Sequence, residues 1–232
     1  MKSIEAFRRL RAGVADVFET SDAAVLLGPA GGHASRVLER LCEAGQVVRL
    51  KRGLWAFPDR LDPLALPGYL AAPLPCYVSL QSALFHHGLI SQVPDVIYAV
   101  SPARTRRWRT PPATVSIHHV SPHFFFGDER LPGGRVRMAT PEKALLDCLY
   151  LSSARSRLFA RLPELDLREG FDRDRARRLL DRLPSARLRP TLLRRLEVLS
   201  NAECGTRNDS STALVDREGH AGPGRRCSSR QS

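Results

Sequence analysis

Residues 20–58 read TSDAAVLLGPAGGHASRVLERLCEAGQVVRLKRGLWAFP, and this stretch decides the fold of the N-terminal part of the chain. Thr20 or Ser21 is suited to cap a short helix, because a hydroxyl there accepts a bond from an unpaired backbone N–H group. The glycines and proline of residues 28–32 cannot continue that helix, so the chain must turn. The next segment repeats apolar residues at helical spacing, and Gly45 is placed to end it. Its apolar stripe is Ala34, Val37, Leu38 and Leu41.

Two β-rich runs follow and flank Lys51-Arg52-Gly53, which predicts a hairpin tip that carries two cations. Short helix, tight turn, amphipathic helix and basic hairpin, in this order, predict a winged helix-turn-helix within residues 1–58. A motif of this kind places its second helix in the major groove of B-DNA. We therefore expect the N-terminal part to bind duplex DNA. The alternative is a winged helix that makes only protein contacts, with its arginines solvated.

The polar face of the second predicted helix supplies the candidate base contacts. Ser35 and Arg36 lie near its start, where side chains most often reach base edges, and Arg40 lies one turn further on. The cations of the hairpin are expected along the flanking DNA backbone, where they add affinity without sequence readout. The complete set of expected DNA-binding residues is His33, Ser35, Arg36, Arg40, Arg49, Lys51 and Arg52.

The charge balance of the chain fits a polyanionic partner. The sequence has 36 Lys and Arg against 24 Asp and Glu, which gives a net charge of +12. Only Lys2, Lys51 and Lys143 are lysines, a usage typical of a GC-rich genome, so the place of an arginine is more informative than the number of arginines. The most basic segment is 151–200, where the run 172–178 alternates in sign and is typical of a solvated helix face.

The sequence predicts a cytoplasmic protein with free thiols. Its first residues lead into an amphipathic helix and show no targeting signal. No run approaches the roughly 20 apolar residues that span a bilayer. The apolar side of this helix is formed by Ile4, Phe7, Leu10, Val14 and Val17. The cysteines stand far apart without a C-x-x-C pair, at positions 42, 76, 148, 204 and 227.

A proline-rich connector over residues 59–75 follows the winged helix. Counting Pro58, it brings five prolines into 18 residues, and its apolar content predicts that it packs against the protein. We expect a second domain over 76–199 and a disordered tail over 200–232, which is rich in Ser, Gly and Arg. The expected fold class is α+β: an N-terminal winged helix-turn-helix, a mixed α/β C-terminal domain and a disordered tail.

Within the second domain the patterns alternate between helices and strands. A helix is expected from Ser79 to Gly88 and another from Thr140, whose hydroxyl caps it ahead of a proline at its first position. Strands are expected over 96–100 and 114–120, with a basic loop from Pro102 to Pro112 between them. A further strand pair is expected over 124–126 and 134–138, and helices dominate from there to about residue 199.

Three stretches together resemble a known family. Residues 52–58 (RGLWAFP) end the winged helix, and residues 77–89 (YVSLQSALFHHGL) and 139–147 (ATPEKALLD) lie in the second domain. Over residues 1 to about 199 the chain resembles the AbiEi-type antitoxins of abortive-infection type IV toxin–antitoxin systems. Many regulators share the winged-helix part, whereas the two downstream motifs are more specific.

The resemblance implies a transcriptional autorepressor that binds inverted repeats in its own promoter. It also implies that the second domain counters a nucleotidyltransferase-like toxin without forming a stable complex. Basic residues outside the wing vary freely in such families, so no base contact carries over. The motif residues of the antitoxin-type domain are Ser79, Ser82, Glu142, Lys143 and Asp147.

Local roles account well for these motif residues. Ser79 and Thr140 are placed to cap helices, and Glu142 is placed at a helix N-terminus. Lys143 and Asp147 have the spacing of an i,i+4 ion pair. No glycine-rich phosphate loop is followed by a lysine, and no lysine lies in an Asp/Glu-x-Lys nuclease core. We therefore expect no enzymatic activity and no cofactor.

Histidines occur in two groups, His86-His87 and His118-His119 with His123, but no cysteine or carboxylate spacing of a zinc site accompanies them. We expect no metal. Two alternatives to the antitoxin stay open: a nuclease or hydrolase domain positioned by the winged helix, and a ligand-sensing transcriptional regulator.

Overall fold

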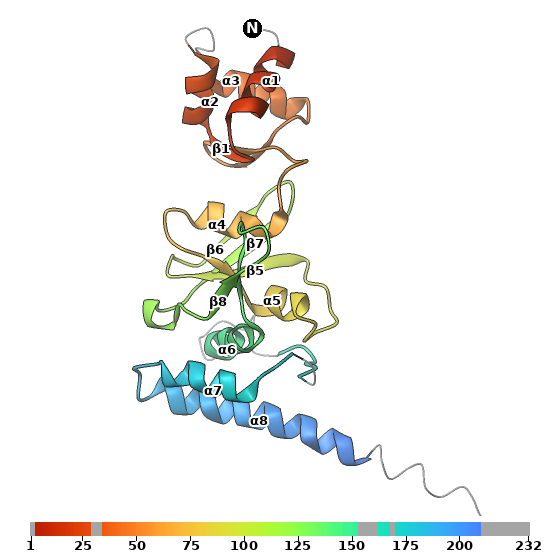
Figure 1. The fold of residues 1–232 in the computed structure, drawn as a ribbon, viewed down its shortest axis with the longest axis vertical. Helices are drawn as coiled ribbons and strands as arrows, with labels where there is room; N and C mark the ends of the chain where they lie inside the picture. Colours follow the sequence, from red (N-terminus) through yellow and green to blue (C-terminus); the bar gives the residue numbers. More distant parts are fainter. Residues whose placement is uncertain (1–2, 29–33, 153–161, 168–169, 210–232) are drawn as a thin grey trace, which may run out of the picture.

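The computed structural model describes residues 3–28, 34–152, 162–167 and 170–209. The described chain is elongated, with α1, α2 and α3 at one end, a mixed sheet in the middle and α7 and α8 at the other end (Figure 1). The fold is mixed α+β, as predicted. Among the described helices, none combines the length and the apolar character needed to cross a membrane.

The N-terminal unit, residues 3–58, has its own core. Its helices are α1 (Ser3–Gly13), α2 (Thr20–Leu27) and α3 (Ala34–Glu43), and its strands are β1 (Val17–Glu19), β2 (Val48–Lys51) and β3 (Leu54–Ala56). The strands form an antiparallel sheet in the order β1-β3-β2. The predicted helices and hairpin are confirmed, and Gly45 ends α3 with a φ of +69°. Side chains that fill the core include Leu10, Phe18, Leu27, Leu38, Leu41, Trp55 and Phe57.

Two local predictions for this unit were wrong. The predicted apolar stripe of the first helix includes Ile4 and Val17, but Ile4 is 69% exposed and Val17 begins strand β1. Thr20 does not cap α2: Glu19 precedes the helix, and its backbone N–H donates to Asp22 Oδ2 at 2.8 Å. The Thr20 hydroxyl instead accepts a bond from Trp55 Nε1 at 2.9 Å, which ties α2 to the hairpin.

The second unit is organised around a mixed sheet. Its described strands are β4 (Tyr77–Val78), β5 (Val96–Ser101), β6 (Arg106–Arg109), β7 (Thr114–His119), β8 (Asp128–Arg130) and β9 (Arg137–Ala139). They lie in the order β6-β7-β5-β4-β9-β8, with parallel pairing of β5 to β7 and of β4 to β9. Its helices are η2 (Pro63–Ala65), α4 (Leu66–Ala71), α5 (Leu80–His86), η3 (Pro122–Phe124), α6 (Pro141–Ser152), α7 (Arg173–Asp181) and α8 (Leu188–Asp209).

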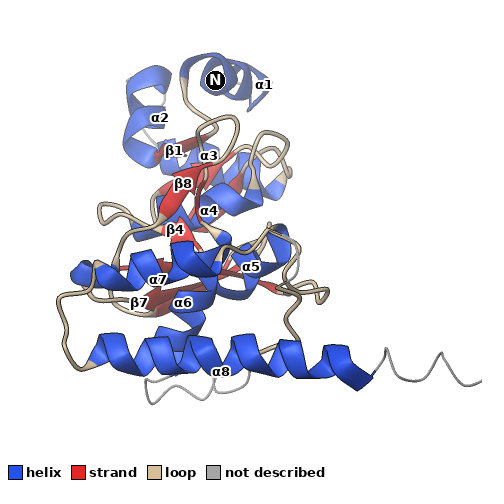
Figure 2. Ribbon diagram, turned by 60° about the horizontal axis from the view of Figure 1, so that its bottom comes forward, coloured by secondary structure: helices blue, strands red, loops and turns tan. Residues whose placement is uncertain are grey.

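The two faces of this sheet belong to different apolar clusters. Ala99, Val115 and Ile117 pack in one cluster with side chains of α4. Val100 and Met138 belong to the cluster built with α5 and α6. Helices α7 and α8 pack against α6, and α8 lies across the end of the molecule (Figure 2). The alternation of side chains along the strands therefore assigns one face to each layer.

Several boundaries in this unit differ from the sequence prediction. The basic stretch 102–112, expected as a loop, contains strand β6. Residues 124–126 do not form a strand; β9 pairs with β8 instead. Helix α8 continues to Asp209, so the first ten residues of the predicted tail are helical, while 210–232 lie outside the described residues.

A third apolar cluster joins the two units. It unites Leu50 and Leu54 of the hairpin with Leu66 of α4 and Ile117 of the sheet. Polar contacts reinforce it: Lys51 Nζ donates to the carbonyl oxygens of Tyr69 and Leu70, at 3.3 Å each, at the end of α4. An ion pair also links Arg135 to Asp16. The connector over 59–75 packs as predicted, and it forms part of this interface, which we call the joint.

We predict that Leu66→Ala lowers the free energy of unfolding by about 2–5 kcal/mol, because the fully buried side chain would leave a cavity in the joint. Trp55 lies in one unit and Trp108 in the other. Urea unfolding followed by tryptophan fluorescence and circular dichroism should still show one coincident transition at lower urea. Leu74→Ala, at a side chain that is 47% exposed, is the control. Two separate transitions in the unmodified chain would contradict a shared core.

Candidate nucleic-acid interface and buried motif cluster

Helix α3 presents a polar face opposite its buried stripe. Ser35 and Arg36 lie in its first turn, Arg40 lies one turn on, and all three are exposed. Within the described part of the chain, neither arginine has a carboxylate at ion-pair distance, although Glu39 and Glu43 share the exposed face. His33, the remaining candidate before this helix, lies outside the described residues. The helix therefore offers two exposed cations to a partner, Arg36 in its first turn and Arg40 in its last.

The three basic candidates of the hairpin have different surroundings. Arg49 is exposed, and its guanidinium carbon lies 5.5 Å from the centroid of the Trp55 ring. Arg52 is exposed at the tip, beside Gly53 with a φ of +78°. Lys51 differs, because its ammonium group is bound to the end of α4. A lysine that donates to helix C-terminal carbonyls is engaged in the joint, while the DNA contact expected for Lys51 stays a prediction.

The motif residues Lys143 and Asp147 form a buried ion pair on α6. Both side chains are 0% exposed, and the pair has the predicted i,i+4 spacing. Asp147 Oδ2 also accepts bonds from Ser79 Oγ at 2.6 Å and from the Tyr77 hydroxyl at 3.2 Å. Lys143 Nζ lies 3.7 Å from the centroid of the Phe124 ring. The pair is thus enclosed by hydroxyl donors on one side and aromatic rings on the other.

Burial dominates the electrostatics of this cluster. It lowers the pKa of Lys143 and raises the pKa of Asp147, and in each case the charge of the partner opposes the shift. The hydroxyl bonds to Asp147 favour its ionised form. Burial, followed by the charge of Asp147, raises the pKa of Tyr77 well above its usual value, so the phenol remains a donor. Lys143 and Asp147 remain hydrogen-bonded to each other, and the side chains of the cluster are buried.

The other motif residues also hold elements together. Ser82 Oγ accepts a bond from Tyr98 N at 2.8 Å and donates to the Val96 carbonyl at 3.2 Å, which fixes α5 to β5. Glu142 is 2% exposed, and its Oε1 accepts a bond from Asp172 N at 3.1 Å, at the residue preceding α7. Its Oε2 has no hydrogen-bond partner among the described atoms but lies 3.6 Å from Arg175 Nε.

The predicted caps in these motifs are only partly correct. Thr140 Oγ1 lies 3.4 Å from the backbone nitrogen of Lys143, a weak cap of α6. Ser79 precedes α5 as predicted, but its hydroxyl donates to Asp147 and makes no cap bond. The next residue, Leu80, has a φ of +58°, a left-handed conformation that costs about 1–2 kcal/mol in a non-glycine residue. Its fully buried side chain holds it there.

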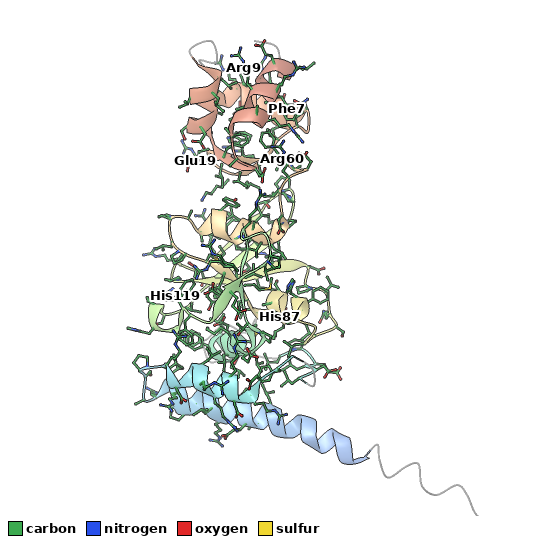
Figure 3. The ribbon with its side chains drawn as sticks, in the orientation of Figure 1. Phe7, Arg9, Glu19, Arg60, His87 and His119 are labelled. Atoms are coloured by element: carbon green, nitrogen blue, oxygen red, sulfur yellow. The ribbon has the colours of Figure 1, made fainter. Side chains whose placement is uncertain are left out.

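Among the described residues the histidines are spread over the second unit, and the cysteines are free, with Cys76 and Cys148 buried. The described residues contain no group of three or more His, Cys, Asp or Glu side chains that could hold a metal ion. His87 and His119 lie on different sides of the second unit (Figure 3). Burial lowers the pKa of His118 to about 4, so this ring is neutral at physiological pH. Burial also raises the pKa of Cys76 to about 12, which suppresses the thiolate.

An open pocket of about 280 Å³ lies beside strands β5 and β6. Gln81, Tyr98 and Arg107 contribute to its lining, together with Asp95. Asp95 and Arg107 make no ion pair there within the described structure, and none of the five motif residues lines the pocket. The pocket and the motif cluster are therefore separate features.

Neither a comparison with models of known protein families nor one with curated proteins gives a match for this chain.

We predict that Lys143→Met lowers the free energy of unfolding by about 3–5 kcal/mol, because it leaves the fully buried Asp147 carboxylate without its counter-charge. The double variant Lys143→Met/Asp147→Leu should recover most of this loss, since it removes both charges. Urea denaturation of the single and double variants measures the difference. A single variant as stable as the unmodified chain would rule out this structural role.

Proposed function

We propose that the protein is a DNA-binding transcriptional autorepressor whose N-terminal unit is a winged helix-turn-helix. One observation carries the proposal: the exposed face of α3 holds Ser35, Arg36 and Arg40, and these arginines have no carboxylate at ion-pair distance within the described residues. An arginine that is free of protein partners keeps its planar set of donors for phosphates or for guanine.

The order of elements supports the same proposal. Helix α2, a connection at Gly28, helix α3 and the hairpin β2–β3 follow one another, and α2 packs against both α1 and α3. The side chains buried by α3 face this core, so its other face is left for the major groove. Arg49 and Arg52 remain the hairpin cations that are exposed, and they suit phosphate contact.

We further propose that the chain is an antitoxin of the AbiEi type that counters a nucleotidyltransferase-like toxin. The support is the resemblance of residues 77–89 and 139–147 to that family. The residues of these motifs contact one another or neighbouring elements and make a rigid scaffold. We propose a role that is not enzymatic, because the ammonium group of Lys143 and the carboxylate of Asp147 are withdrawn from any substrate.

We predict that Arg36→Ala weakens binding to the protein's own promoter by about 1–3 kcal/mol and relaxes its sequence preference, because a base contact would be lost. Fluorescence anisotropy with promoter and scrambled duplexes measures both effects. Arg187→Ala is the matched control, since Arg187 is also exposed and lacks an ion pair among the described residues, but precedes α8. The proposal fails if the unmodified protein does not bind the promoter at low salt.

We predict that a single substitution in the full chain can abolish repression and leave protection from the toxin intact. Arg36→Ala, expressed from an unrelated promoter, should lose repression of the native promoter but still restore growth after induction of a nucleotidyltransferase-like toxin encoded beside it. The reason is that α3 lies in the N-terminal unit, whereas the motif cluster lies in the second. Promoter-reporter activity and growth curves give the two readouts. Loss of growth with an intact fold would contradict an antitoxin function of the second unit.

A further inference from the structure

The open pocket beside β5 and β6 has no part in the functions proposed above. Residues from several elements line it: Gln81 in the first turn of α5, Tyr98 in β5 and Arg107 in β6. Pro163 and most of the segment 90–96, which links α5 to β5, complete the lining. Residues that are far apart in the sequence therefore meet around one hollow in the second unit.

Hydrogen bonds hold the walls of this pocket in position. The Ser82 hydroxyl joins α5 to β5 through one bond that it accepts and one that it donates. Asp166 N donates to the Leu89 carbonyl at 2.8 Å, which ties the segment 162–167 to the residue preceding the lining segment 90–96. Strand β6 pairs with β7 along its whole length. The pocket is thus built on elements that are fixed to one another.

The polar side chains of the lining include four that are not engaged by the protein. Within the described part of the chain, no hydrogen bond or ion pair involves the side chains of Gln81, Gln92, Asp95 and Arg107. Asp95 and Arg107 are exposed and carry opposite charges, yet they do not lie at ion-pair distance from each other. One pocket therefore presents an anionic and a cationic group, and neither is neutralised by a protein partner.

The rest of the lining is largely apolar. Its apolar members are Ile90, Val93, Pro94, Val96 and Pro163. Val93 is 67% exposed, so an aliphatic group placed against it would remove apolar surface of both molecules from water. The pocket thus combines a pair of opposite charges with an apolar wall.

We propose that this pocket binds a free α-amino acid with a small aliphatic side chain. The guanidinium of Arg107 donates to the α-carboxylate, and the carboxylate of Asp95 accepts from the α-ammonium group. The amides of Gln81 and Gln92 supply further donors and acceptors to the same two groups. The aliphatic side chain of the ligand lies against the apolar wall. This site is separate from α3, so its test does not depend on DNA binding.

Other classes of ligand fit the lining less well. A purely anionic ligand is repelled by Asp95, and a purely cationic ligand is repelled by Arg107, whereas a zwitterion pairs with both. The volume of about 280 Å³ lies at the lower end of the roughly 300–1,000 Å³ of small-molecule pockets. A ligand as small as an amino acid is therefore favoured over a nucleotide or a peptide.

Equilibrium dialysis of the full chain with isotope-labelled L-valine and L-leucine tests the proposal. We expect saturable binding of both at one site per chain. Valinamide lacks the carboxylate and N-acetylvaline lacks the ammonium group. Each should compete with labelled valine about 10- to 100-fold less well than unlabelled valine, because each loses one charged hydrogen-bonding group.

Substitutions locate the binding in this pocket. Asp95→Asn and Arg107→Gln should each weaken valine binding by about 10- to 100-fold, since each removes one charge that faces the ligand. The matched controls are Glu164→Gln and Arg104→Gln, at exposed residues outside the lining, and they should bind valine as the unmodified chain does. Circular dichroism should show the same thermal unfolding for all four variants, because all four side chains are exposed.

Three results would overturn the proposal. The first is the absence of valine and leucine binding at millimolar concentrations. The second is competition by valinamide or N-acetylvaline that equals competition by valine. The third is valine binding that neither Asp95→Asn nor Arg107→Gln weakens, which would place the amino acid outside this pocket. None of these results bears on promoter binding by α3.

Discussion

The apolar joint is the constraint on which the arrangement of the whole molecule depends. Leu50 and Leu54 of the hairpin, Leu66 of α4 and Ile117 of the sheet lose contact with water only if the two units stay together. The contact between Lys51 and α4 follows from this arrangement, because the packed hairpin brings the Lys51 ammonium group to the end of α4. The joint thus engages one cation of the hairpin, which is partly buried, and links the unit that carries α3 to the sheet.

The second unit depends on a polar interaction that burial makes costly. The side chains of Lys143 and Asp147 are shielded from solvent, and a buried pair of this kind is tolerated only when further groups hydrogen-bond to it. Ser79, before α5, and Tyr77, in β4, supply donors to Asp147. Gly127, with a φ of +78°, lets the backbone approach, since a Cβ there would lie 3.1 Å from Lys143 Cγ. One ion pair therefore organises β4, α5 and α6 around a shared centre.

The sequence predicts well whatever depends on local periodicity. The stripe of α3 and the glycine that ends it are visible in one turn-by-turn pattern, as is the Lys143–Asp147 spacing. The sequence is a poor guide to strands whose formation depends on pairing with residues far away in the chain. Strand β6 is a strand because it pairs with β7, which is a long-range interaction. Strand β1 has only three residues, too few to show an alternating pattern. Neither the burial of the ion pair nor the engagement of Lys51 leaves a local signal, because partners distant in sequence create both.

DNA binding through α3 is the central claim, and a hydroxyl-radical footprint of the chain on its own promoter tests it most directly. The account predicts protected sugars on an inverted repeat in that promoter, at protein concentrations that leave scrambled DNA unprotected. It also predicts that the sequence-specific protection is lost with Arg36→Ala while Arg187→Ala preserves it. Uniform cleavage across the promoter at low salt, or protection that Arg36→Ala does not alter, would contradict it.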